Sequence, residues 1–272
     1  RALTDLVGPG RGPTARLRGL VAPHIDLWRG RAGYRAAYGE LLGAPPADLY
    51  VLFGTGHAGP DAPLTGCELD WATPLGTAPT ARGFVAEVHA ALGAPDPAAL
   101  LMHRDEHSVE FQVLFLQHLH ERRGLPPPRI AAFLCGALPA TTGDPLQEPW
   151  CRDLLAAVAA AAQRHGGHVL WLAGADLAHV GPMFGDPAPV DDARLARLAA
   201  ADRAWLTHLD RGAPGAFHRA IDAAGNPDRI CSAPAITLCA ALAAGRGELL
   251  HYGQAQAPDG SQAVSFSALA FR

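Results

Sequence analysis

Short apolar runs alternate with longer segments of helical periodicity along most of the chain. The apolar runs are typical of buried strands, and they cover residues 17–22, 49–53, 130–134 and 168–173, with alternating serine and apolar positions at 264–271. Apolar positions three and four apart predict helices over residues 34–42, 80–92, 108–123, 150–165, 194–209 and 235–244. Because strand and helix signals alternate, we expect an α/β fold with a largely parallel or mixed central sheet flanked by helices.

Two segments depart from this alternation. Residues 1–15 are rich in glycine and proline and predict a loose lead-in, so that residues 16–272 form a single α/β domain. Residues 54–79 are rich in Gly, Pro and Thr and long for a connection, which indicates either a functional loop or a small hairpin excursion.

Composition narrows the class of partner. With 272 residues and 49% hydrophobic content, the chain can bury a full core as one domain. A net charge of −4 without a basic run argues against nucleic acid, and no apolar stretch reaches the ~18 residues that suggest a membrane span. All 22 basic residues are arginine, which excludes Schiff-base lysine chemistry and a P-loop lysine. We therefore expect a small-molecule or peptide substrate.

The five cysteines form no CxxC pair and are odd in number, so a disulfide framework is not expected. This usage indicates a reducing, cytoplasmic location. We interpret four of the thiols as small buried hydrophobic groups: Cys67, Cys135, Cys151 and Cys239.

Groups that bind metals or transfer protons follow several of the predicted strands. His24 and His57 come just after two of them, and Cys231 opens a further segment of the same kind. Two imidazoles and a thiolate from separate loops could hold Fe, Zn or Cu in an open site, because they leave coordination positions for substrate or oxygen. His179, three residues after Asp176, could transfer a proton beside that ion, with Asp176 orienting it. Structural polar roles are the alternative for each histidine.

Residues 104–110 concentrate acids, a histidine and a hydroxyl at a predicted helix start. Helix capping explains the acidic residues and Ser108, but it does not require His107, so Glu106 and His107 are candidate site residues. A cysteine nucleophile at Cys231 with His179 as its base is another interpretation. It leaves His24 and His57 without a role.

These segments, in this order, resemble the Memo-like family, which includes the bacterial proteins called AmmeMemoRadiSam system protein B. The resemblance extends over residues 22–236 and rests on residues 22–26 with 29–30, 54–57, 73–76, 106–112, 175–182 with 184–186, and 231–236. It implies a fold similar to class III extradiol dioxygenases, in which two histidines and a carboxylate hold a non-haem iron and another histidine acts as acid and base.

Carried over by motif, the resemblance implies that His24 and His57 are metal ligands and that Cys231 replaces the carboxylate. It places His179 at the catalytic histidine and makes Asp176, Glu106 and His107 residues that line the site. We therefore expect a non-haem Fe(II) protein of oxidoreductase or dioxygenase type, with Cu or Zn as the other metals. The alternatives are a metal-binding or peptide-binding module without turnover and, third, a zinc-dependent hydrolase.

Overall fold

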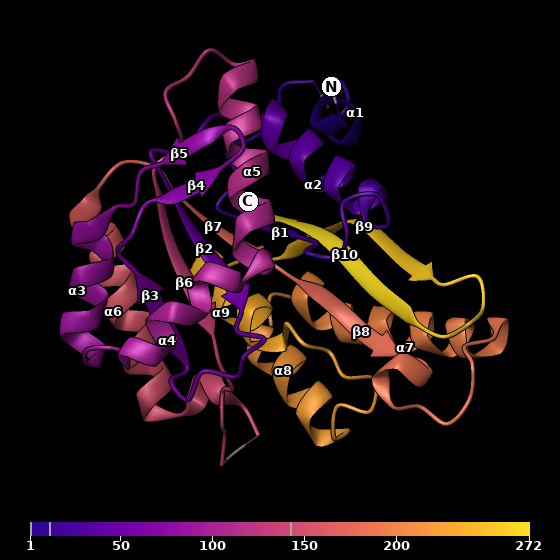
Figure 1. Ribbon diagram of the computed structural model, residues 1–272. Helices are drawn as coiled ribbons and strands as arrows, with labels where there is room; N and C mark the ends of the chain where they lie inside the picture. The colour runs from indigo at the N-terminus through magenta and orange to yellow at the C-terminus, as the bar shows by residue number, and fades with distance from the viewer. Residues whose placement is uncertain (1, 11, 142) are drawn as a thin grey trace.

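A mixed β-sheet forms the centre of the structure, a computed structural model that describes residues 2–10, 12–141 and 143–272 (Figure 1). Over the described residues the sheet has the strand order β3-β6-β2-β7-β1-β10-β8, and β9 pairs with β10. Strands β6, β2, β7 and β1 run parallel to one another, and the outer pairings are antiparallel. The predicted single α/β domain with a mixed central sheet is confirmed.

The sheet strands are β1 (Gly19–Ala22), β2 (Leu49–Thr55), β3 (Leu64–Cys67), β6 (Ile130–Cys135), β7 (Val169–Gly174), β8 (Asp176–Val180), β9 (Gly247–Gln256) and β10 (Ala263–Phe271). A separate hairpin is formed by β4 (Trp71–Thr73) and β5 (Gly76–Ala78). The helices are α1 (Ala2–Val7), α2 (Arg31–Gly43), α3 (Arg82–Leu92), α4 (Pro97–Met102), α5 (His107–Arg122), α6 (Pro149–His165), α7 (Asp192–Asp210), α8 (Pro214–Ala223) and α9 (Ala233–Ala243). Short 3₁₀ turns are η1 (His103–Asp105), η2 (Pro145–Gln147) and η3 (Pro182–Phe184).

Helices cover both faces of the sheet because successive side chains of a strand point to opposite sides. Leu52 of β2 packs in the core with α1, α2 and α5, whereas its neighbours Val51 and Phe53 pack in the core with α3, α6, α7, α8 and α9. Burial on both faces explains why the inner parallel strands are continuous apolar runs in the sequence.

Two sequence expectations need correction. The lead-in is not loose throughout, because Ala2–Val7 form α1, and Leu6 and Val7 are buried against the core under α2 and α5. Asp176 and His179 do more than follow the strand predicted over 168–173, because Asp176–Val180 itself forms a further strand, β8, which pairs antiparallel with β10. The segment over residues 54–79 contains β3 and the β4–β5 hairpin, as the hairpin alternative predicted.

Candidate metal centre

The carboxyl ends of three parallel strands meet at one level of the sheet. Gly174, the last residue of β7, pairs with Ala22 of β1 on one side and with Gly54 of β2 on the other. His24 and His57 each follow their strand by two residues. Because these strand ends are aligned, both histidines lie at the same edge of the sheet. Ligand sites of α/β proteins are usually found at this edge.

Helix α5 approaches this edge closely because two glycines leave room for it. A Cβ atom on Gly174 would lie 2.0 Å from the Ser108 carbonyl oxygen, and one on Gly54 would lie 2.6 Å from the Ser108 hydroxyl. Hydrogen bonds hold the contact: Ser108 Oγ donates to the Thr55 carbonyl at 3.2 Å, and the Gln112 amide donates to the Pro23 carbonyl at 3.0 Å. The start of α5, with Glu106 and His107, is thereby fixed beside the strand ends.

Three imidazole rings gather at this point. Over the described residues, one nitrogen each from His24, His57 and His107 forms a group in which all atoms lie within 4.8 Å of one another. The ring of His107 stacks on that of His57, with centroids 4.9 Å apart and 16° between the planes. Both rings lie nearly perpendicular to the ring of His24, at 76° and 80°, with centroids 5.0 and 5.2 Å from its own. His24 is buried, whereas the His57 and His107 side chains are 37% and 46% exposed, so the group opens toward solvent.

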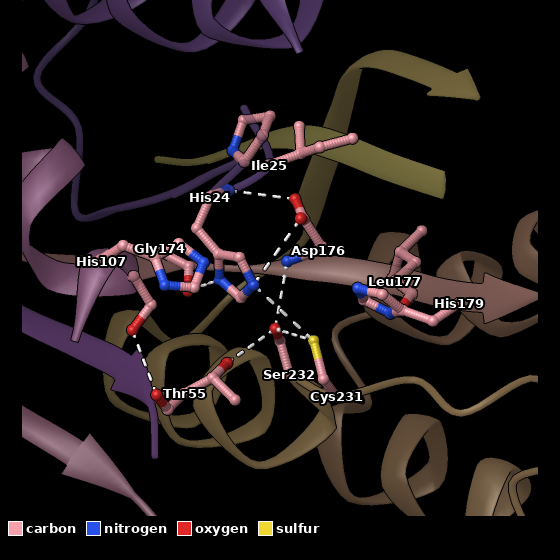
Figure 2. Close-up of polar contacts among 12 residues, drawn as sticks. His24, Ile25, Thr55, His107, Gly174, Asp176, Leu177, His179, Cys231 and Ser232 are labelled. Carbon is pink, nitrogen blue, oxygen red and sulfur yellow. Dashed lines mark hydrogen bonds and ion pairs between the residues drawn. The ribbon is translucent and has the colours of Figure 1, made fainter. Parts of the chain in front are cut away.

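His24 is held in the tautomer that a metal ligand needs. Its Nδ1–H donates to the Gly174 carbonyl at 2.9 Å, which leaves the Nε2 lone pair free. Burial lowers the pKa of His24 to about 4, so the ring is neutral at physiological pH. Nε2 faces Asp176 Oδ2 at 3.6 Å and Cys231 Sγ at 3.8 Å (Figure 2). A lone pair, a carboxylate oxygen and a sulfur that converge in this way suit a bound cation.

Glu106 orients His57 in the same manner. Its carboxylate accepts the His57 Nδ1–H at 2.9 Å and also the His57 backbone N–H at 3.1 Å. Burial alone would raise the pKa of Glu106, but the hydrogen bonds from His57 and from the Ser108 N–H outweigh it and lower this pKa to about 2. Glu106 is thus a carboxylate that caps α5 and directs His57 Nε2 away from itself, an arrangement common behind metal-bound histidines.

Cys231 lies on the opposite side of the His24 ring from His107 in the view of Figure 2. It is partly buried in the loop before α9, where Arg229 has a positive φ of 52°. Ser232 links this loop to the sheet: its hydroxyl contacts Thr55 Oγ1 at 2.8 Å and accepts the Asp176 N–H at 3.1 Å. Burial and the Asp176 charge raise the pKa of Cys231 to about 12, so without a cation the sulfur is a thiol.

Asp176 and His179 occupy different positions relative to the three rings. Asp176 is buried, and its Oδ1 accepts the His24 backbone N–H at 3.0 Å; burial raises its pKa to about 6. His179 lies three residues further along β8, donates from Nδ1 to the Leu177 carbonyl at 3.2 Å and packs against Phe184. In the described part of the chain no ring contact joins His179 to His24, His57 or His107.

The structure therefore brings together most of the site residues expected from the sequence. His24, His57, Glu106, His107, Asp176 and Cys231 converge at one edge, and His179 stands beside them. The proposed Cys231–His179 nucleophile gains no support, because the thiol contacts His24 and its pKa is raised rather than lowered. Sequence reasoning missed Gly174, Gln112 and Ser232, which hold the site in place. Gln112 and Ser232 carried a signal, since both lie in segments on which the family resemblance rests, whereas Gly174 carried none.

The fold and this edge define an α/β protein with a histidine-rich candidate metal centre at the carboxyl ends of parallel strands. A sequence model described as Memo-like protein matches residues 1–270. The chain belongs to the Memo-like family.

Curated relatives carry the same family name. A MEMO1 family protein from Archaeoglobus fulgidus is 37% identical over 102 residues, which is 37% of this chain and 36% of the relative. One from Methanococcoides burtonii is 30% identical over 166 residues, or 60% of this chain and 55% of the relative. One from Aquifex aeolicus is 27% identical over 176 residues, or 65% and 43%. The matched part of the chain thus spans about a third to about half of the length of these relatives.

The length and apolar content of the helices decide whether any of them could cross a membrane. Over residues 2–10, 12–141 and 143–272, none combines the length and the apolar content that a bilayer crossing requires.

Proposed function

We propose that the chain binds a transition-metal ion through His24 and His57, with His107 and Cys231 as neighbouring donors, and that it is a metal-dependent oxidoreductase. The single observation that supports this is the convergence of three imidazole nitrogens within 4.8 Å, beside a sulfur 3.8 Å from His24 Nε2. Imidazole and thiolate donors suit Fe(II), Cu and Zn, and we expect Fe(II).

The protein groups around the donors fit such an ion. Glu106 and the Gly174 carbonyl each take the Nδ1–H of one histidine, so both rings present Nε2. Ser232 keeps the Cys231 loop against the sheet. When bound, the ion would supply open coordination positions for substrate and an oxidant such as O₂.

His179, with Asp176 beside it, would transfer protons during the reaction. His179 uses Nδ1 to bind the Leu177 carbonyl, which leaves Nε2 to take up or release a proton. Burial lowers the pKa of His179, and the neighbouring Asp176 charge opposes this, so the ring is neutral and can act as a base. Phe184 against its ring limits the access of water from that side.

Metal analysis after anaerobic purification and Fe(II) loading tests the proposal. We expect about one iron per chain in the wild type and in a His165→Ala control, which changes a partly exposed histidine at the end of α6. A His24→Ala, His57→Ala double variant should retain less than a tenth of that iron. Equal and negligible iron and copper in wild type and double variant would refute the proposal.

Oxygen consumption separates the oxidoreductase from the two alternatives. Iron-loaded wild type should consume O₂ with a suitable small molecule or peptide, and the double variant should not. Activity that survives only in zinc-loaded protein would favour a hydrolase. Ligand binding at this edge without any turnover would favour a binding module.

A further inference from the structure

A cleft of about 360 Å³ opens directly beside the candidate metal centre. It is lined by Thr55, the last residue of β2, by Gly56 and by Ile221 and Asp222 of α8, and Cys231 belongs both to this lining and to the centre. It thus occupies the crevice outside the carboxyl ends of β2 and β6, and its volume lies within the range of small-molecule sites.

His218 of α8 is one of the residues that line this cleft, and a buried polar atom of its ring has no partner in the described structure. The residue is only 9% exposed, and its Nδ1 is buried without a hydrogen bond in the described structure. Burial lowers the pKa of His218, so the ring is neutral and Nδ1 can accept a hydrogen bond. Buried polar atoms are normally satisfied, so this atom requires an explanation that the fold itself does not provide.

The charge of the cleft selects among ligands. Asp222, which is exposed, is the charged side chain of the lining as far as the structure describes it, and no arginine faces the cleft. The N-terminus of α9, at Ala233 and Pro234, adds about half a positive charge, which does not cancel a full carboxylate. An anionic substrate would therefore find no cationic partner here.

We infer that this cleft receives the substrate of the metal centre, and that the substrate is a small neutral or cationic molecule whose hydroxyl or amino group is bound by His218 and Asp222. The inference rests on the proposed function, because Cys231 connects the cleft to the donors of the ion.

Three probes of one size test the ligand class: benzylamine, benzyl alcohol and benzoate. Their dissociation constants are measured by ligand-observed NMR on the metal-free full chain at low salt. We expect benzylamine to bind at least tenfold more tightly than benzoate, with benzyl alcohol between them. Asp222→Asn should remove most of the advantage of benzylamine, and His218→Ala should weaken both benzylamine and benzyl alcohol.

Two variants make the result specific to this cleft. Ala137→Trp places a large ring at an exposed position of the lining and should abolish binding of all three probes, whereas Asp153→Asn, on the exposed face of α6, should change nothing. Benzoate bound as tightly as benzylamine, or probe binding unaffected by Ala137→Trp, would overturn the inference. Because these measurements use metal-free protein, absent iron binding with an intact probe preference would refute the metal centre and leave the ligand class supported.

Discussion

The close contact between Gly174 and helix α5 should affect both the stability of the fold and the affinity of the candidate centre for metal. In Gly174→Ala, the new Cβ would lie 2.0 Å from the Ser108 carbonyl oxygen, whereas ordinary contact begins near 3.4 Å. The start of α5 would have to retreat by about 1.4 Å, and overpacking of this size costs about 1–3 kcal/mol. The free energy of unfolding, measured by urea denaturation, should fall by that amount.

The same displacement of α5 should disturb the positions of both histidine ligands, His24 and His57. The Cβ would also lie 2.8 Å from the Gln112 amide nitrogen, which holds the Pro23 carbonyl next to His24. Glu106, which orients His57, caps the helix that moves. Because loss of such outer contacts typically lowers metal affinity about 10–100-fold, we expect a loss in that range in a chelator competition with Fe(II).

Gly83→Ala is the matched control. Gly83 lies in α3, and apart from its chain neighbours and the backbone of its own helix nothing lies within 4 Å of its Cβ position, so alanine should stabilise the helix by up to about 1 kcal/mol and leave the affinity for iron unchanged. If Gly174→Ala unfolds at the wild-type urea midpoint and binds iron equally well, the close approach does not position the site, and this reasoning is wrong.

Two further predictions concern individual carboxylates. Glu106→Gln should lower the affinity for Fe(II) about 10–100-fold, because a neutral amide holds the His57 N–H less strongly; an unchanged chelator titration would contradict this. Burial raises the pKa of Asp202 from 3.8 to about 6, so the folded state keeps a proton that the unfolded state loses, and the stability of the wild type falls as pH rises through this window. The stability of Asp202→Asn relative to wild type should therefore increase by about 2 kcal/mol between pH 4 and pH 6, in urea denaturation at several pH values, and a flat difference would refute it.

The inner sheet could be predicted from the sequence because its strands are buried on both faces. Residues 49–53 and 130–134 carry no polar side chains other than Tyr50, and they form β2 and β6. The antiparallel edge could not be predicted as easily. Strand β9 is mostly half-buried, so its apolar and polar residues mix without a clear period. Helix α8 is short and was not predicted, although Pro214 at its start was a usable signal.

The candidate site likewise contains residues that the sequence could predict and residues that it could not. His24 and His57 could be found because each comes within a few residues of the end of an apolar run, and parallel strand ends meet at one edge. The pairing of Glu106 with His57 joins residues 49 positions apart and depends on glycine contacts under α5, which no local pattern reveals. The position of His179 depends on the pairing of β8 with β10, which the sequence did not indicate.

Anomalous diffraction from anaerobically grown crystals of the Fe(II)-loaded protein tests the metal centre most directly. Difference maps collected on either side of the iron absorption edge should show one peak within about 2.0–2.4 Å of ring nitrogens of His24 and His57. Crystals that contain iron by elemental analysis but show no peak between these two rings, or show it at other residues, would contradict the proposed centre.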